Sequence, residues 1–361
     1  NKRPSTMITK RKLHKAWLIV RKTSLNADLL KFSRNFIKTV RGKYKRDASI
    51  PIPFPTTLSL ELTNKCNLHC ITCPREYDFG KKLVMGNMDT ALAKKIIDQT
   101  YPYVQSMGLT GMGETLFAPN LVEVAKYIKS KKKSIVIFIS TNANHPGFIE
   151  RITPVLPHID TVQISIDGVG DTYDTIRHGG TFANLDANLR ALTPLVRDRD
   201  IDLMFNMVIT KKNFRDMPAL VRYADEHHVG FVNFTYFNLA CATSVPLDYY
   251  KFFSTPEFLE VVAATKAEAA LHPEIEVTGL DFPGDPGIRK CPLMWNHFQI
   301  NYDGKVPPCC AKPFTDEYCF GDVTQKPVID VLNSPEAQAL RATWVSGKPH
   351  PFCAKCHFVH L

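Results

Sequence analysis

The chain has 361 residues, of which 44% are hydrophobic and 22% are charged, the balance of a soluble globular protein. No apolar run reaches the roughly 18 residues that a membrane-spanning helix needs, and the apolar stretch at 16–20 is too short for a signal peptide. We therefore expect a cytoplasmic protein. A reducing compartment disfavours disulfides among its ten cysteines, so their clustering indicates metal binding.

The formal net charge of +10 is concentrated at the N-terminus. Residues 1–50 contain 15 Lys or Arg and two acidic residues, whereas the other 311 residues contain 30 Lys or Arg and 33 acidic residues. The basic character therefore belongs to an N-terminal extension, and we expect no nucleic acid partner for the body of the protein.

Apolar residues in this extension recur at helical spacing, with basic residues on the other faces. The apolar stripe consists of Leu18, Leu25, Leu29, Phe32, Phe36 and Val40. We expect residues 1–50 to form a basic amphipathic helix that packs its stripe on the protein body. Peripheral contact with an anionic membrane surface is the alternative. The Pro-rich stretch at 51–55 is a stiff linker that marks the domain boundary.

From this linker to residue 240, short β-rich runs alternate with helical stretches. Six strands are predicted at 57–63, 106–110, 135–140, 161–166, 202–208 and 231–237. Helices are predicted between them, including 89–99, 121–131, 182–195 and 217–228. This alternation predicts an α/β domain over 51–240, in which helices cover a parallel sheet. The active site of such a domain lies at the carboxyl ends of the strands.

The remaining sequence divides into two parts. Residues 241–290 read as a bridge, with a helix over 255–271 and a Pro/Gly-rich turn at 282–287. Residues 291–361 form a small Cys-rich α+β unit, with a predicted hairpin over 299–307 and a helix over 335–345.

Three cysteines follow the first predicted strand. Cys66, Cys70 and Cys73 have C-x3-C-x2-C spacing, which can cap three irons of a cubane cluster and leave the fourth iron open. A structural zinc site normally closes with four ligands, and His69 is poorly placed as a fourth because it adjoins Cys70. The segment therefore favours a reactive iron–sulfur cluster.

This segment, with its flanking Thr-Asn-x-Cys-Asn-Leu, resembles the signature of the radical S-adenosylmethionine (SAM) superfamily. The resemblance implies a partial (β/α)6 barrel and a [4Fe–4S] cluster whose open iron is chelated by the methionine part of SAM. It implies reductive cleavage of SAM to a 5′-deoxyadenosyl radical, which abstracts a substrate hydrogen, with a flavodoxin or ferredoxin as reductant. Thr72 departs from the family, where this position is often aromatic, so the packing of the adenine must differ.

Glycines and polar residues at the later strand ends match SAM-binding segments of the same superfamily. Residues 111–114 resemble its Gly-Gly-Glu motif, which binds the SAM amino group, and Arg177 follows at the distance of a partner for the SAM carboxylate. The cofactor-binding residues implied by the resemblance are Gly111, Gly113, Glu114, Ser140, Asn142, Ser165, Asp167, Arg177 and Asn206.

Six further cysteines lie in residues 291–361 and offer four thiolates for either zinc or a second [4Fe–4S] cluster. This segment resembles the SPASM extension of radical SAM enzymes in its single-cluster, twitch-type form. The resemblance implies a second [4Fe–4S] cluster held by Cys291, Cys309, Cys353 and Cys356, with Cys310 or Cys319 as alternates to Cys309.

Cys241 stands alone after the sixth predicted strand, at the expected barrel mouth. A partly exposed thiol there can return a hydrogen atom to a substrate radical and complete an epimerisation. The alternative is a small buried apolar residue, as most free cysteines are.

We expect a radical SAM oxidoreductase or epimerase acting on a carbohydrate-like small molecule such as a sugar, cyclitol or aminoglycoside. One alternative is the modification of a ribosomal peptide or a lipid-linked substrate. A hypothesis of another class is a non-catalytic iron–sulfur or zinc scaffold that binds a polyanion through its basic N-terminus.

Overall fold

The computed structural model describes residues 30, 31, 33–35, 37, 38, 51–280, 291 and 293–361. The predicted apolar stripe of the extension and the turn at 282–287 lie outside these residues. The described part of the extension is helical, and the buried side chain of Asn35 exchanges two hydrogen bonds, of 2.8 and 3.0 Å, with the backbone of Phe54. That helical stretch therefore contacts the chain just before the first strand. None of the described helices is long and apolar enough to cross a membrane.

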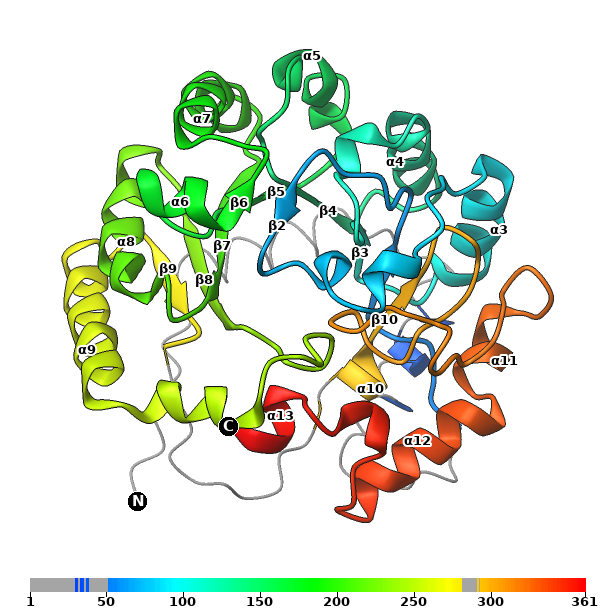
Figure 1. The fold of residues 1–361 in the computed structure, drawn as a ribbon. Coiled ribbons are helices and arrows are strands. Elements are labelled where there is room, and N and C mark those ends of the chain that lie inside the picture. The colour runs from blue at the N-terminus through cyan, green and yellow to red at the C-terminus, as the bar shows by residue number, and fades with distance from the viewer. Residues whose placement is uncertain (1–29, 32, 36, 39–50, 281–290, 292) are drawn as a thin grey trace.

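A parallel sheet of eight strands, curved into an open barrel, forms the centre of the protein (Figure 1). Its strand order is β10-β1-β3-β4-β5-β7-β8-β9. The strands are β1 (Thr57–Leu60), β3 (Ser106–Leu109), β4 (Val136–Thr141), β5 (Thr161–Ser165), β7 (Asp202–Ile209), β8 (Phe231–Tyr236), β9 (Glu276–Thr278) and β10 (His297–Ile300). The six predicted strands are present in the predicted order and are parallel, which confirms the α/β fold class.

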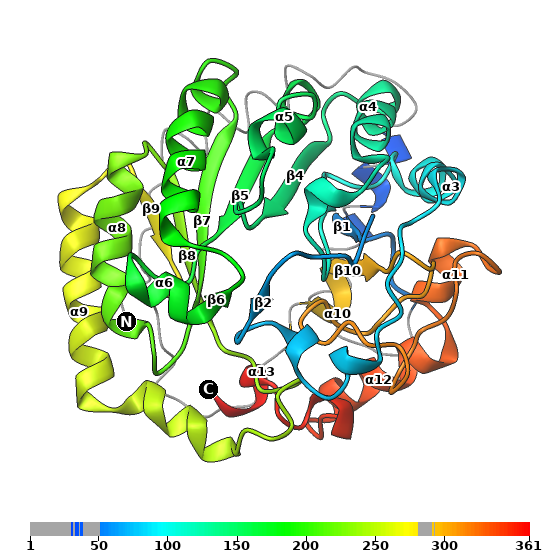
Figure 2. The same cartoon turned by 45° about the horizontal axis from the view of Figure 1, so that its top comes forward.

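Helices line the outside of this sheet, as Figures 1 and 2 show. They are α3 (Thr90–Thr100), α4 (Leu121–Lys131), α5 (Phe148–Ile152), α7 (Phe182–Arg197), α8 (Met217–Glu226) and α9 (Pro256–Leu271). The short helix α6 (Asp171–Ile176) lies instead on the inner side of α7 and α8. Side-chain caps fix several of their starts: Asp89 accepts from the first backbone N–H groups of α3, and Thr181 and Thr255 do so for α7 and α9.

Residues of β4, β5 and β7 alternate between fully buried and half-buried positions. The buried set, such as Ile139, Ile164 and Phe205, belongs to the hydrophobic core. Because successive side chains of a strand point to opposite faces, the half-buried set faces the barrel interior. Ser140 and Asn206 belong to this interior set.

Of the predicted hairpin over 299–307, the turn is present, closed by a 2.9 Å hydrogen bond from the Asn301 N–H to the Lys305 carbonyl, but its two halves do not pair as strands. Its first half belongs to β10, which pairs in parallel with β1 and so extends the barrel sheet. After the turn, the backbone of Val306 exchanges hydrogen bonds with Phe320 and Gly321 instead, at 2.9 Å each. The physical reason is that the exposed edge of β1 carries unpaired backbone groups, and β10 satisfies them.

The C-terminal unit continues with short helices that lie beside the β10 edge of the barrel (Figure 1). They are α10 (Leu293–Asn296), α11 (Val328–Leu332), α12 (Pro335–Val345) and α13 (His357–His360). The helix predicted over 335–345 coincides with α12, which Ser334 caps through the N–H of Ala337 at 3.2 Å.

Candidate active site and auxiliary cysteine site

The loop that carries Cys66, Cys70 and Cys73 follows β1 and crosses the carboxyl ends of the strands. Two of its residues form β2 (His69–Cys70), which pairs in antiparallel fashion with β6 (Arg177–His178) and aligns Cys70 with Arg177. Figure 2 shows β2 and β6 inside the ring of strands and helices. The Cys73 N–H donates to the Cys70 carbonyl at 2.9 Å, so the last two cysteines share one tight turn.

Two asparagines fix the first cysteine to the end of β4. The Asn142 Nδ2 donates to Asn67 Oδ1 at 3.0 Å and lies 3.8 Å from the Cys66 sulfur. In return, the Asn67 Nδ2 donates to the carbonyl of Asn144 at 2.8 Å. Asn142, a predicted SAM contact, thus contacts the cysteine loop directly.

The glycines after β3 allow this strand end to pack on the cysteine loop. A Cβ atom at Gly113 would lie 2.5 Å from the carbonyl oxygen of Thr63, and one at Gly111 would lie 2.4 Å from the Cγ of Glu61. Neither position accepts a side chain: Gly113 is required for close approach to the backbone of the cysteine loop, and Gly111 for close approach to the side chain of Glu61.

Glu114 is buried between these loops. Its carboxylate accepts the N–H of Asn142 at 2.7 Å and the N–H of Leu116 at 3.2 Å, and its own N–H donates to the Lys65 carbonyl at 2.8 Å. Burial raises the pKa of this carboxyl group, and the N–H donors only partly oppose that effect. Glu114 therefore joins the ends of β3 and β4 to the cysteine loop.

Asp167 and Arg177, both predicted to reach SAM, form a buried ion pair of 3.0 Å with each other. Asp167 also accepts the N–H of Val208 at 2.8 Å and the hydroxyl of Thr72 at 3.1 Å. Burial acts to lower the pKa of Arg177, but Asp167, Cys70 and the other neighbouring acidic groups together raise it overall. The guanidinium stays charged, with Nη1 3.8 Å from the sulfur of Cys70.

Thr72 is the residue that departs from the superfamily pattern, and the structure gives it a partner in Asp167. Sequence reasoning proposed Asp167 and Arg177 separately and missed that Thr72, Asp167 and Arg177 form one network. The pairing of β2 with β6 brings these residues together. Strands of two residues are too short to be predicted from a sequence pattern.

Polar side chains form hydrogen-bonded pairs across neighbouring strands of the barrel interior. Ser140 and Ser165 lie 3.3 Å apart, and Gln163 donates to Ser140 at 3.0 Å. Asn233 donates to Asn206 at 2.7 Å and accepts the hydroxyl of Thr278 at 2.8 Å. We call these six residues the polar wall. The sequence analysis did not predict Gln163, Asn233 and Thr278 as site residues. Their positions could have identified them, because alternate residues of a strand face the same side.

The four predicted auxiliary ligands line one small pocket. They are Cys291, Cys309, Cys353 and Cys356. Of the proposed alternates, Cys319 is turned toward backbone, with its sulfur 3.4 Å from the carbonyl of Gly321. Cys310 adjoins Cys309, and the hydrogen bond between their side chains lowers the pKa of Cys309 to about 7. Neither alternate lines the pocket.

The donor sets of both sites consist of thiols held inside the protein. Burial raises the pKa of Cys70 to about 12, that of Cys73 to about 11 and that of Cys291 to about 12. Cationic iron deprotonates such thiols when it binds. Three thiolates at the barrel mouth and four in the pocket match the chemistry of iron–sulfur clusters. Among the described residues, no three His, Cys, Asp or Glu side chains are arranged around a single metal ion.

Cys241 follows β8 as predicted, but it is only 2% exposed, so the partial exposure on which its proposed donor role relied is not found. Its thiol donates to the carbonyl of Ala311 at 3.2 Å. Burial raises its pKa, so the side chain is a neutral thiol. Cys241 thus lies where the loop after β8 meets the C-terminal unit.

That loop connects the barrel mouth to the auxiliary pocket. The Asn238 Nδ2 lies 3.8 Å from the sulfur of Cys356, and both Asn238 and Ala240 line the pocket. The Tyr250 hydroxyl accepts the N–H of Leu239 at 2.9 Å and donates to the carbonyl of Lys355 at 2.8 Å. The segment that follows β8 therefore contacts the auxiliary pocket directly.

Two family models match this chain. The radical SAM superfamily model matches residues 60–224, and the model of the SPASM iron–sulfur cluster-binding domain matches residues 291–357. The chain belongs to the radical SAM superfamily. It is a radical SAM enzyme with a C-terminal SPASM domain, and its cofactors are SAM and [4Fe–4S] clusters. These matches confirm the predicted family and cofactors.

Individual relatives of this radical SAM enzyme are distant. It is 23% identical to a tungsten-containing aldehyde ferredoxin oxidoreductase cofactor-modifying protein of Pyrococcus furiosus, over 83% of this chain and 86% of that one. It is 26% identical to the antilisterial bacteriocin subtilosin biosynthesis protein AlbA of Bacillus subtilis, over 85% of this chain and 66% of that longer one. Its fold resembles Streptococcus suis SuiB bound to the precursor peptide SuiA, with a TM-score of 0.63, 15% identity, and coverage of 93% and 76%.

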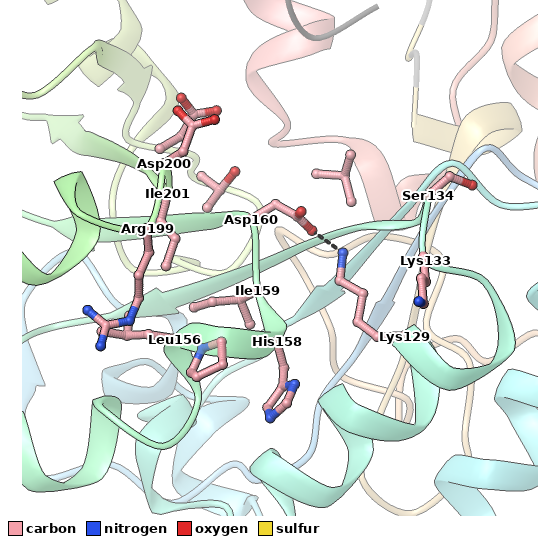
Figure 3. Close-up of a pocket in the computed structure, with 14 residues that line it drawn as sticks. Lys129, Lys133, Ser134, Leu156, His158, Ile159, Asp160, Arg199, Asp200 and Ile201 are labelled. Carbon is pink, nitrogen blue, oxygen red and sulfur yellow. Dashed lines mark hydrogen bonds and ion pairs between the residues drawn. The ribbon is translucent and has the colours of Figure 1, made fainter. Parts of the chain in front are cut away.

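A separate, larger cavity of about 680 Å³ lies at the opposite end of the barrel. It opens at the first residues of β4, β5 and β7, whereas the predicted site residues follow the last ones. Figure 3 shows the Lys129 ammonium directed at Asp160, at 2.5 Å. No predicted SAM or cluster residue lines this cavity.

Proposed function

We propose that this radical SAM enzyme oxidatively modifies a peptide substrate at the mouth of its barrel. Cys66, Cys70 and Cys73 hold the cluster that binds SAM, and the pocket cysteines Cys291, Cys309, Cys353 and Cys356 hold the auxiliary cluster. A cluster at the first site would supply the electron that cleaves SAM, and a cluster in the pocket would supply an acceptor for the electron left after hydrogen abstraction and proton loss.

The contacts of the barrel mouth support this assignment of roles. Arg177 places a positive charge beside Cys70, which offsets part of the negative charge that three thiolates bring to a cluster. Glu114 uses both carboxylate oxygens within the protein, so its role is to hold the loop at 111–113 against the cysteine loop. The backbone of that loop is then the surface available to the SAM amino group.

The relatives favour a peptide over the carbohydrate-like substrate expected from the sequence. A bacteriocin biosynthesis protein aligns with most of this chain. The polar wall supplies amides and hydroxyls, which hydrogen-bond to peptide groups as well as to sugar hydroxyls. The wall therefore accommodates either class, and the preference for a peptide comes from the sequence relatives.

The single observation that carries the oxidative outcome is the loop after β8. It brings Asn238 to 3.8 Å from the Cys356 sulfur, so the barrel mouth and the auxiliary site are in direct contact. An electron acceptor at this position suits dehydrogenation. Epimerisation instead requires a hydrogen donor that faces the substrate, and the Cys241 thiol is buried against the Ala311 carbonyl.

The test uses the full chain with both clusters reconstituted under anaerobic conditions, together with SAM, dithionite and candidate peptides encoded beside its gene. We expect 5′-deoxyadenosine together with a peptide that has lost the mass of two hydrogens. Cys70→Ala is the matched inactive control. Modification of a sugar or cyclitol by the wild type, with every peptide unchanged, would contradict the proposal.

A further inference from the structure

We infer that a surface beside the first cysteine loop is the docking site for a small acidic one-electron carrier protein. We call this surface the docking patch and define it as Lys65, Lys81, Lys82, Val84 and Met85. The carrier is oxidised by one electron, and the cluster at the barrel mouth is reduced by one electron. The inference rests on the assignment of Cys66, Cys70 and Cys73 under the proposed function, but it does not depend on the substrate.

The docking patch contacts the chain on both flanks of the cysteine loop. The Asn64 Nδ2 donates to the carbonyl of Val84 at 2.8 Å, and Asn64 precedes Cys66 by two residues, or about 7 Å of extended chain. On the other flank, Arg75 follows Cys73 by two residues and lies 3.9 Å from the sulfur of Met85. This surface therefore lies a short covalent and hydrogen-bonded path from the cluster ligands.

Two large apolar side chains are exposed together in the docking patch. Val84 is 75% exposed and Met85 is 46% exposed. Neighbouring exposed apolar residues rimmed by charge are the composition of a protein contact surface. An interface for electron transfer is among the smallest of specific interfaces, so a patch of this size is sufficient.

The charge of the docking patch is positive. Lys65, Lys81 and Lys82 are exposed, and no carboxylate pairs with them among the residues that the structure describes. Nearby acids are engaged elsewhere: Glu76 pairs with His69 at 3.2 Å, Asp78 accepts the hydroxyl of Thr243, and Asp303 pairs with Lys305 at 3.4 Å. An unpaired cluster of lysines attracts an acidic partner and accelerates its association.

The C-terminal domain holds the docking patch in place. The Tyr302 hydroxyl donates to the carbonyl of Val84 at 2.9 Å. Gly86 lies so close to the Tyr302 ring that a Cβ atom there would be 2.0 Å from the nearest ring carbon. A fixed surface suits a carrier protein, because docking then carries little ordering cost.

The experiment measures cluster reduction without any peptide, so failure of the substrate proposal leaves it unaffected. The enzyme with both clusters is mixed with an acidic flavodoxin in its hydroquinone form, and cluster absorbance is followed by stopped flow. In Lys81→Glu/Lys82→Glu we expect the rate at low salt to fall about tenfold or more and to lose its salt dependence. Titration with oxidised flavodoxin should show the same loss of affinity.

The matched control reverses two exposed lysines away from the docking patch. Lys126→Glu/Lys326→Glu changes the net charge equally, and we expect its rate to stay within about twofold of wild type. Val84→Ser/Met85→Ser should slow reduction by flavodoxin without changing the salt dependence. Reduction by dithionite, which needs no docking, should be unchanged in all variants.

Two results would overturn the inference. An unchanged rate with flavodoxin in Lys81→Glu/Lys82→Glu would show that the carrier docks elsewhere. An equal loss of the rates with flavodoxin and with dithionite would show that these residues support the cluster rather than the carrier.

Discussion

At the scale of single residues, the site depends on buried charges that satisfy one another. Asp167 is fully buried and holds Arg177, Thr72 and the backbone of Val208 at the same time. A charge left alone in such surroundings is strongly unfavourable. The pair therefore both fixes the position of β6 and keeps a cation beside Cys70.

Arg177→Gln should lower the free energy of unfolding by about 3 kcal/mol or more, because it leaves the Asp167 carboxylate buried and uncompensated. Arg215→Gln removes a surface ion pair with Glu257, in which both side chains are more than half exposed, and should cost about 1 kcal/mol or less. Anaerobic chemical denaturation of both variants measures the difference. Equal losses in the two variants would show that the buried pair has no special role.

Glu61 gives the stability of the fold a pH dependence. Burial is the main cause that raises its pKa from 4.5 to about 7, although its carboxylate accepts the N–H groups of Met112 and Tyr302 at 2.7 and 3.3 Å. Glu61 binds its proton more tightly in the folded state than in the unfolded state. Its contribution to the free energy of unfolding is therefore greatest below pH 4.5. It falls as the pH rises to about 7, by about 3 kcal/mol in total.

Glu61→Gln removes this titration, so the slope of unfolding free energy against pH between pH 5 and 7 should become flatter than in the wild type. Denaturation midpoints of both proteins across that range measure the effect. Identical slopes would mean that Glu61 ionises in the folded state as it does in water.

At the scale of elements, local sequence patterns predicted the strands and helices that short-range interactions determine. The six barrel strands and the helices between them follow from periodicity and caps, and their bounds agree with the structure to within a few residues. Two-residue strands such as β2 have no periodicity to detect. The pairing of β10 with β1 joins His297 to Thr57, a contact between distant parts of the chain that no local pattern contains.

The same distinction applies to the site. The cysteines were identified by their spacing, since metal ligation requires particular residue types at particular intervals. The Asp167–Arg177 pair and the burial of Cys241 depend on how distant segments pack. The cluster ligands could therefore be predicted from the sequence, whereas the network of side chains around them is visible only in the structure.

Gly113→Ala tests the close approach of the β3 loop to the cysteine loop. The added methyl group would lie 2.5 Å from the Thr63 carbonyl and 2.6 Å from the Lys65 carbonyl, both backbone atoms, so one loop must move. We expect SAM affinity, measured by anaerobic calorimetry, to fall about tenfold, or about 1.4 kcal/mol. Met112→Ala leaves the backbone unchanged and serves as control. Wild-type affinity in Gly113→Ala would contradict this role of the glycine.

At the scale of the whole molecule, the barrel and the SPASM domain form one structure. β10 completes the edge of β1, the backbone of Tyr302 contacts Glu61, and the Tyr250 hydroxyl contacts Lys355. The auxiliary site thus lies on an integral part of the barrel, at a fixed position relative to its mouth.

Removing residues 291–361 should destabilise the barrel itself, because the edge of β1 loses its partner strand. Cys353→Ala/Cys356→Ala removes only two cysteines of the pocket. That variant should keep the circular dichroism spectrum of the wild type, lose the iron of one cluster and still cleave SAM. Loss of the fold in the double variant, or a stable truncated barrel, would contradict this view of the two units.

The most direct test of the central claim follows one hydrogen atom. A candidate peptide deuterated at carbon is incubated with the reconstituted enzyme, SAM and dithionite, and the 5′-deoxyadenosine is analysed by mass spectrometry. Oxidative modification of the peptide predicts 5′-deoxyadenosine that carries deuterium, together with a peptide that has lost it. 5′-Deoxyadenosine without deuterium from every peptide, but with deuterium from a labelled sugar or cyclitol, would contradict the account.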